Sequence, residues 1–220
     1  SLEIDLIIIG PETPLANGLG EFLRSKNFLV FGPGSDGAKL ESSKAWAKAF
    51  MKEANIPTSN SWEISSIQKA KEIIYSNPNP LVVKADGLAS GKGVFICETK
   101  EECIQKTEEI LNGEFGDAGN LIVLEEKIEG PEVSIFAITD GHKYILLPSA
   151  QDHKRIDEND KGLNTGGMGA YSPTPILSKS ELSIICKKII EPTIDELIKR
   201  NIDYRGVLYF GLMITKSGPK

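Results

Sequence analysis

The amino-acid sequence predicts an α/β protein in which a parallel strand–helix–strand unit leads into an α+β region. Ile4 to Ile9 is a near-continuous apolar run, which is typical of a strand buried on both faces. Apolar residues between 15 and 23 then recur at helical spacing, and Phe28 to Phe31 form a second short strand. From Ser59 to Glu125 the order becomes β-α-β-β-α-β, which is typical of a small α+β domain.

Composition narrows the class of protein. The 220 residues suffice for one large or two small domains, and 40% hydrophobic with 25% charged residues is ordinary for a globular chain. A net charge of -6 leaves no dominant basic surface, and no apolar run approaches a membrane span. We therefore expect no nucleic-acid and no membrane partner. The three cysteines, Cys97, Cys103 and Cys186, do not have the spacing of a metal-binding motif, so we expect reduced thiols. Reduced thiols, together with the absence of a signal-peptide pattern, predict a cytoplasmic location.

Gly10-Pro11-Glu12 breaks the first strand at its carboxyl end. Ligands of parallel sheets bind beyond the carboxyl ends of the strands, so this tripeptide is a candidate ligand contact, with a simple turn as the alternative. Residues 42–54 then form a predicted helix with Lys44 in its first turn. The helix dipole disfavours a cation there by roughly a few tenths of a kcal/mol unless an anion neutralises it. Lys44 therefore hints at a phosphate partner, and a solvated lysine is the alternative.

The small α+β domain contains a glycine-rich hairpin from Leu81 to Phe95. Lys84 ends its first strand, Gly87, Gly91 and Gly93 lie in the connecting loop, and Lys92 precedes the second strand. Glycines let backbone N–H groups approach an anion, and lysines add point charges, so the hairpin suits phosphates. The spacing differs from that of a P-loop, which needs four residues before Gly-Lys and a helix after it. An ordinary hairpin with solvated lysines is the alternative.

An acidic segment follows the last strand of this domain. Leu121 to Leu124 runs directly into Glu125-Glu126-Lys127-Ile128, and Glu132 opens an alternating strand that continues to Thr139. Carboxylates beside an apolar strand end suit an adenine amino group and ribose hydroxyls. A solvated acidic loop is the alternative.

Two further motifs lie in the second half of the chain. One motif places an acid, an imidazole and two cations within five residues, Gln151-Asp152-His153-Lys154-Arg155. His153 could act as a general base, and a role in hydrogen bonding or in neutralising a phosphate is the alternative. Asn164 to Pro173 contains three glycines, which predicts a flexible loop that could cradle a carboxylate or phosphate. Ser178 and Glu181 then cap a long helix, Pro192 kinks or restarts it, and Gly206 to Ile214 is a final strand.

Taken together, these motifs resemble the ATP-grasp enzymes, and more narrowly the phosphoribosylamine–glycine ligase (glycinamide ribonucleotide synthetase) family of purine synthesis. The resemblance is carried in order by Gly10-Pro11-Glu12, Leu40-Glu41-Ser42-Ser43-Lys44, Lys84 to Gly93, Gln151 to Arg155 and Asn164 to Pro173. The last two motifs are specific to this ligase. The resemblance implies an ATP-grasp fold that follows the remainder of an N-terminal parallel α/β domain.

The resemblance also divides the chain. Residues 1–40 would end the substrate-binding N-terminal domain, and 41–58 would be a linker helix and the start of the ATP-grasp core. Residues 59–124 would form the small lid domain, and 125–220 a truncated main domain. The implied enzyme is an ATP-dependent carbon–nitrogen ligase that forms glycinamide ribonucleotide, ADP and phosphate from glycine, 5-phosphoribosylamine and ATP through a glycyl phosphate.

The resemblance implies a role for each motif. Lys84 and Arg155 would be catalytic, by holding or stabilising phosphoryl charge. The implied nucleotide contacts are Lys44, Lys84, Gly87, Ser90, Gly91, Lys92, Gly93, Glu125, Glu126, Lys127, Ile128 and Glu132. The implied substrate contacts are Gly10, Pro11, Glu12, Asp152, His153 and Lys154 for phosphoribosylamine, and Asn164, Thr165, Gly166, Gly167 and Met168 for glycine.

The chain also departs from the family pattern. The family has a strand and glycine-rich turn before the position of Ser1, and beyond Lys220 a strand whose Glu and Asn bind Mg²⁺ or Mn²⁺. We therefore assign no metal ligand within the 220 residues, and expect this piece alone to be inactive. A monomer or weak dimer is expected. The alternatives are another ATP-grasp carboxylate–amine ligase or a non-catalytic nucleotide-binding module.

Overall fold

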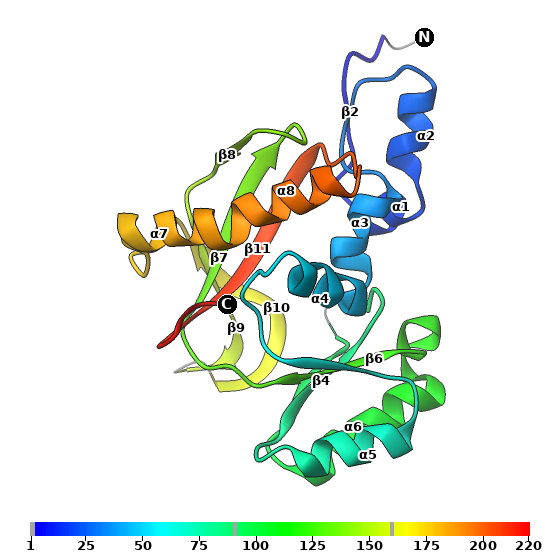
Figure 1. The fold of residues 1–220 in the computed structure, drawn as a ribbon, viewed down its shortest axis with the longest axis vertical. Helices are drawn as coiled ribbons and strands as arrows, with labels where there is room; N and C mark the ends of the chain where they lie inside the picture. Colours follow the sequence, from blue (N-terminus) through cyan, green and yellow to red (C-terminus); the bar gives the residue numbers. More distant parts are fainter. Residues whose placement is uncertain (1–2, 90–91, 159–160) are drawn as a thin grey trace.

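The computed structural model of the protein describes residues 3–89, 92–158 and 161–220, with side chains described at all of these positions except 154, 155 and 161–164. Figure 1 shows an N-terminal segment at the top, a large sheet crossed by a row of helices, and a smaller sheet below with its own helices. Among the predicted site residues, Ser90 and Gly91 lie outside the described residues, as do the side chains of Lys154, Arg155 and Asn164.

The N-terminal segment contains the predicted parallel unit. Strand β1 (Ile7–Ile8) pairs in parallel with β2 (Val30–Phe31), and the chain between them forms helices α1 (Glu12–Ala16) and α2 (Leu19–Ser25). The expectation of a strand buried on both faces is wrong. Ile8 is 67% exposed and Ile9 is 9% exposed, because the sheet has only these two strands among the described residues and much of its apolar surface stays open.

The helix expected at 42–54 is confirmed by α4 (Lys44–Glu53), and a further helix, α3 (Ser35–Ser42), precedes it. Ser43 separates the two helices because its backbone is extended. The Ser43 hydroxyl accepts a hydrogen bond from the Trp46 N–H at 3.1 Å, which caps α4. Helix α3 escaped detection because its polar sequence has no continuous apolar face.

The small sheet has the order β3-β6-β4-β5 and is antiparallel throughout. Its strands are β3 (Ser61–Ile64), β4 (Leu81–Ala85), β5 (Val94–Ile96) and β6 (Ile122–Glu126), and its helices are α5 (Ile67–Ser76) and α6 (Lys100–Glu109). A π-helical turn η1 (Ile110–Glu114) and a 3₁₀ turn η2 (Gly116–Gly119) extend α6. The chain order confirms the predicted β-α-β-β-α-β pattern. Both helices lie on one face, where they bury Ile64, Ile74, Val83 and Leu124.

The large sheet has the order β12-β11-β7-β8. It consists of β7 (Glu132–Thr139), β8 (Tyr144–Leu146), β11 (Gly206–Thr215) and β12 (Gly218–Pro219), and a nearly continuous row of α7 (Lys179–Ile185), η3 (Cys186–Ile190) and α8 (Glu191–Lys199) crosses one face. Buried and exposed residues alternate along β11, so Leu208 and Phe210 pack under these helices while Val207 and Tyr209 face the other way. The core of this region also contains Phe50 of α4.

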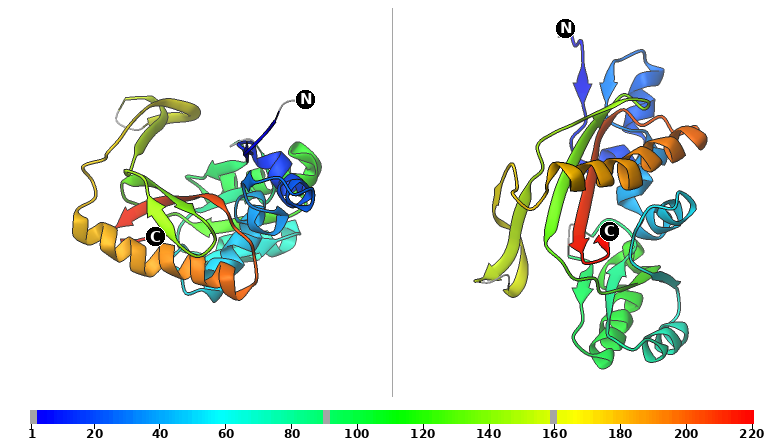
Figure 2. Two further views of the ribbon diagram at one scale, coloured as in Figure 1. Left: turned by 90° about the horizontal axis from the view of Figure 1, so that it is seen from above. Right: turned by 60° about the vertical axis from the view of Figure 1, so that its left-hand side comes forward.

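Strands β9 (Gln151–Asp157) and β10 (Lys161–Tyr171) form a separate antiparallel hairpin. Figure 2 shows that it projects away from the N-terminal segment and from the small sheet. The expectation of a flexible loop at 164–173 is therefore wrong for residues 164–171. The sheet register shifts between Asn164 and Gly169, which lets the strand absorb its glycines as an irregularity, and Gly167 has a φ of 119°.

Candidate functional site

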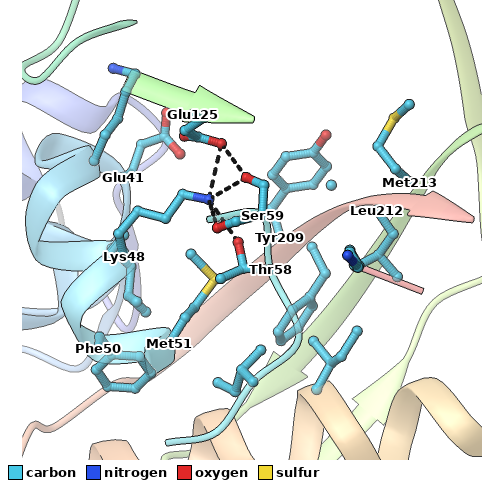
Figure 3. Close-up of a pocket in the computed structure, with 18 of the residues that line it drawn as sticks. Glu41, Lys48, Phe50, Met51, Thr58, Ser59, Glu125, Tyr209, Leu212 and Met213 are labelled. Atoms are coloured by element: carbon cyan, nitrogen blue, oxygen red, sulfur yellow. Dashed lines mark hydrogen bonds and ion pairs between the residues drawn. The ribbon is translucent and has the colours of Figure 1, made fainter. Parts of the chain in front are cut away.

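A cavity of about 1180 Å³ lies between α4, the small sheet and β11. Figure 3 shows its polar end, where Lys48 of α4 points toward Glu125 and the linker residues Thr58 and Ser59. Its apolar end is lined by side chains such as Phe50, Met51 and Leu212. Charged lining residues from five separate parts of the chain meet here, namely Glu12, Glu41, Lys44, Lys48, Lys84, Glu98, Glu125, Glu126, Lys127, Glu129 and Lys220.

Strand register brings Lys84 to Glu125. Val82 lies directly opposite Glu125 in the antiparallel pair of β4 and β6, and Lys84 is two residues further along the same face of β4. Diagonal neighbours of this kind are within reach of long side chains. The Lys84 ammonium accordingly lies 2.8 Å from Glu125 Oε1.

Helical spacing brings Lys48 to the same carboxylate. Lys44 and Lys48 are four residues apart on α4 and therefore share one face of the helix. The Lys48 ammonium lies 2.9 Å from Glu125 Oε2, and the Ser59 hydroxyl donates to the same oxygen at 2.7 Å. Glu125 thus binds two ammonium groups and one hydroxyl while only 7% of the residue is exposed.

The electrostatics favour a fully charged cluster at neutral pH. Burial alone would raise the pKa of Glu125, but the charges of Lys84 and Lys48 outweigh burial and hold that pKa below its ordinary value. Burial lowers the pKa of Lys48, against the opposing attraction of Glu125. Because two lysines face one carboxylate, the cluster carries one net positive charge into the cavity.

Lys44 has a different set of partners. Its ammonium donates to the backbone carbonyls of Asp86 at 3.3 Å and Gly87 at 3.1 Å. The Asp86 carboxylate accepts from the Ala45 N–H at 2.6 Å and from the Ser43 hydroxyl, so this carboxylate lies at the N-terminus of α4. The anion expected beside Lys44 is therefore present as a side chain of the protein. Burial lowers the pKa of Lys44, and Asp86 opposes this shift.

The described part of the glycine loop is packed against its own neighbours. The Gly87 N–H donates to the Ala118 carbonyl at 3.3 Å, and the Ala85 N–H donates to the Gly93 carbonyl at 2.8 Å. A Cβ at Gly87 would lie 2.8 Å from the Ala118 Cβ, and one at Gly93 equally close to the Ala89 Cβ. Glycine is thus required at both positions by close approach, of Gly87 to η2 and of Gly93 to Ala89.

The structure brings together some predicted site residues and leaves others apart. The cavity is lined by Gly10, Glu12, Lys44, Lys84, Glu125, Glu126, Lys127 and Ile128. Other predicted site residues are described by the structure but do not line the cavity, namely Pro11, Gly87, Lys92, Gly93, Glu132, Asp152, His153, Thr165, Gly166, Gly167 and Met168. In the β9–β10 hairpin, His153 stacks on Tyr171 with ring centroids 5.8 Å apart, and Met168 is 60% exposed.

Sequence reasoning missed Lys48, Thr58 and Ser59. Lys48 was detectable, because its spacing from Lys44 places both lysines on one helix face. The contacts of Thr58 and Ser59 with Lys48 depend on how the linker between α4 and β3, residues 54–60, folds back against α4. No local sequence pattern reveals this path.

The described residues contain neither a cluster of metal ligands nor a membrane-spanning helix. No three His, Cys, Asp or Glu side chains lie where they could jointly hold a metal ion. Among the helices that the structure describes, none combines the length and apolar character needed to cross a membrane.

Comparison with known proteins connects this geometry to one family. Residues 1–41 match the family described as "Phosphoribosylglycinamide synthetase, N domain", and residues 42–220 match "Phosphoribosylglycinamide synthetase, ATP-grasp (A) domain". A phosphoribosylamine–glycine ligase from Nostoc is 49% identical over 213 residues, which cover 97% of this chain and 50% of the relative. A trifunctional purine biosynthetic protein adenosine-3 from Chironomus tentans is 49% identical over 218 residues, which cover 99% of this chain and 16% of that protein.

Solved structures agree with this match. The crystal structure of a phosphoribosylamine–glycine ligase from Thermotoga maritima superposes with a TM-score of 0.85 at 35% identity, covering 100% of this chain and 54% of that one. A D-alanyl-alanine synthetase A from Vibrio cholerae has a TM-score of 0.72 at 16% identity, with coverages of 98% and 64%, and shows the fold alone. The chain spans about half the length of the phosphoribosylamine–glycine ligases that it matches.

Proposed function

The chain belongs to the phosphoribosylglycinamide synthetase family, and from that membership we propose that the whole protein is an ATP-dependent ligase. It joins glycine to 5-phosphoribosylamine and produces glycinamide ribonucleotide, ADP and phosphate in de novo purine biosynthesis. The observation that carries the proposal is the cavity in which Lys48 and Lys84 bind one buried carboxylate and Lys44 lines the same wall. The cluster of Lys48, Lys84 and Glu125 carries one net positive charge, and a locally positive site suits the polyphosphate of a nucleotide.

The proposed chemistry proceeds in two steps. A glycine carboxylate oxygen attacks the γ-phosphorus of ATP, the bond to the bridging oxygen breaks, and ADP leaves as glycyl phosphate forms. The phosphoribosylamine nitrogen then attacks the acyl carbon, phosphate leaves with the bonding pair, and the nitrogen loses a proton. Phosphoryl transfer of this kind depends on alignment and charge neutralisation, which are the functions we assign to Lys44 and Lys84.

We place the adenine at the end of β6. This strand ends at Glu126, whose N–H donates to the Asn60 carbonyl at 3.0 Å. Glu125 lies opposite Ser61 of β3 on one side and Val82 of β4 on the other, so its backbone is inside the sheet. The backbone of Lys127 and Ile128 comes next along the cavity wall, and we assign it to the adenine edge. Glu132 is assigned to the ribose hydroxyls on the family resemblance.

The remaining substrate contacts also rest on the resemblance. We assign phosphoribosylamine to residues 10–12 and 152–154, glycine to residues 164–168, and a role in stabilising phosphoryl charge to Arg155. Gly10 and Glu12 line the cavity, which supports the first assignment. The glycine loop at 87–93 would close over the phosphates and exclude water from the acyl phosphate.

A divalent metal, Mg²⁺ or Mn²⁺, is part of the proposal for the whole protein. The described residues offer no cluster that fits such an ion, so we derive no step through it. Small-molecule partners, a cytoplasmic location and a monomer or weak dimer stay predictions.

The test uses the full-length protein with ATP, glycine and 5-phosphoribosylamine. We expect ADP and glycinamide ribonucleotide to appear in equal amounts, each dependent on both substrates. A panel of other carboxylic acids and amines tests the alternative, a different ATP-grasp ligase. ADP release with another acid–amine pair but not with glycine would overturn the proposed substrate. Nucleotide binding without any product would indicate a non-catalytic module.

A further inference from the structure

Lys48 is bonded on all sides within the protein. Its ammonium contacts Thr58 Oγ1 at 2.8 Å, Ser59 Oγ at 2.9 Å, the Ser59 carbonyl at 3.3 Å and Glu125 Oε2 at 2.9 Å. Its side chain is 10% exposed. An ammonium has three N–H donors, and these contacts occupy them all. Lys48 therefore cannot bind a ligand without giving up buried partners.

Lys84 is placed differently, although it shares the same carboxylate. It contacts the other oxygen, Glu125 Oε1, and its side chain is 25% exposed. Each lysine thus binds one oxygen of the carboxylate. Lys48 is the more buried of the two, and Lys84 is the more exposed. Ser59 strengthens the Lys48 side, because its hydroxyl donates to the oxygen that Lys48 binds.

We propose that Lys48 is a positioning residue that neutralises Glu125, so that Lys84 can leave this carboxylate and bind a nucleotide phosphate. The inference rests on the proposed function, because it requires a nucleotide in the cavity. Without Lys48, the pair of Lys84 and Glu125 is neutral, and moving Lys84 to a phosphate leaves a buried carboxylate without a counter-ion, which is strongly unfavourable. With Lys48 present, Glu125 Oε2 keeps both of its partners while Lys84 moves.

A purely structural role for Lys48 makes a different prediction. If Lys48 only ties α4 to the linker at Thr58 and Ser59, its removal loosens the site whatever the charge at Glu125. If it acts as a counter-ion, removing the carboxylate as well restores the balance. The double variant Lys48→Met/Glu125→Gln leaves Lys84 as the single charge of the cluster, and thus returns the net charge of the native trio.

The experiment is a calorimetric titration of ATP and AMP into the full-length protein and its variants. We expect Lys48→Met to weaken ATP binding at least tenfold, and the double variant to bind within threefold of the native protein. The loss should be larger for ATP than for AMP, since AMP lacks the terminal phosphates. Lys48→Arg should retain most of the affinity, and Lys52→Met, an exposed lysine on the same helix, should have no effect.

The outcomes separate the two proposals. A double variant as weak as Lys48→Met, or equal losses for ATP and AMP, would overturn the role of Lys48 and leave the proposed function standing. Native protein that binds no ATP would overturn the proposed function and the inference with it. Thermal unfolding of each variant identifies any that fail to fold. In that case the ATP-to-AMP ratio for Lys48→Arg decides, and a ratio well below the native one overturns the inference.

Discussion

The cavity around Glu125 and the β9–β10 hairpin differ in how the sequence motifs relate to the fold. In the cavity, residues from α4, β4 and β6 that are distant in sequence meet within hydrogen-bonding distance. In the hairpin, the two motifs most specific to the ligase family pair with each other along adjacent strands and do not line the cavity among the described residues. The proposed nucleotide contacts are thus assembled by the fold, while most of the proposed substrate contacts lie on a projecting element.

Among the variants that test this contrast, Lys84→Met is expected to have the largest effect, on both ATP affinity and ligase activity. The variant removes the lysine that we assign to a nucleotide phosphate, so we expect ATP to bind at least tenfold more weakly, about 1.4 kcal/mol. Ligase activity of the full-length protein should fall about a hundredfold or more, since charge stabilisation is lost in the transition state. Calorimetry and the rate of ADP formation measure the two effects. Lys69→Met, an exposed lysine on α5, is the control. Unchanged ATP affinity in Lys84→Met would show that the cavity is not organised around this lysine.

Glu125→Gln tests the buried cluster through stability. Two lysines lose their shared counter-ion, and we expect a loss of about 3 kcal/mol in the free energy of unfolding near neutral pH. The folded-state pKa of Glu125 lies below its ordinary value of 4.5, so the carboxylate stabilises the fold above that value. This stabilisation is lost as the pH falls through the folded-state pKa. The native protein and the variant should therefore converge in acid.

Denaturant unfolding at several pH values measures this difference. Glu98→Gln is a matched control, because the pair of Glu98 and Lys127 is a surface ion pair 3.2 Å long, and its loss should cost about 0.5 kcal/mol or less. A difference between native and Glu125→Gln protein that stayed constant from neutral to acid pH would mean that the charge of Glu125 does not stabilise the fold.

Asp86→Asn should have a smaller effect at the edge of the same region. The carboxylate accepts from the Ala45 N–H and the Ser43 hydroxyl at the start of α4, and an amide replaces it as a weaker, uncharged cap. We expect a loss of about 1 kcal/mol in unfolding free energy, measured by denaturant titration. Asp195→Asn on the exposed face of α8 should cost much less. Equal losses in the two variants would mean that the contacts of the Asp86 carboxylate with the start of α4 do not stabilise the fold.

The same contrast explains how far sequence reasoning reached. The parallel N-terminal unit, the β-α-β-β-α-β order and the capping box at Ser178 were predictable, because each depends on local periodicity or on a fixed spacing. The meeting of Lys84 with Glu125 depends on strand register, and that of Lys48 with Ser59 on the path of the linker. Neither leaves a local signal. Asn164 to Tyr171 was misassigned because glycines are typical of loops, whereas here a register shift holds them in a strand.

His153→Gln, in the β9–β10 hairpin, is expected to have the smallest effect on ATP binding in the cavity. His153 stacks on Tyr171 within the hairpin and does not line the cavity, so ATP affinity should stay within about twofold of native, less than 0.5 kcal/mol. If the hairpin presents phosphoribosylamine contacts, as proposed, the KM for that substrate should rise while the KM for ATP does not. Lys143→Gln, in the exposed turn between β7 and β8, is the control. A weakening of ATP binding as large as that of Lys84→Met would mean that the hairpin folds over the cavity in solution. The two regions would then form one site instead of two.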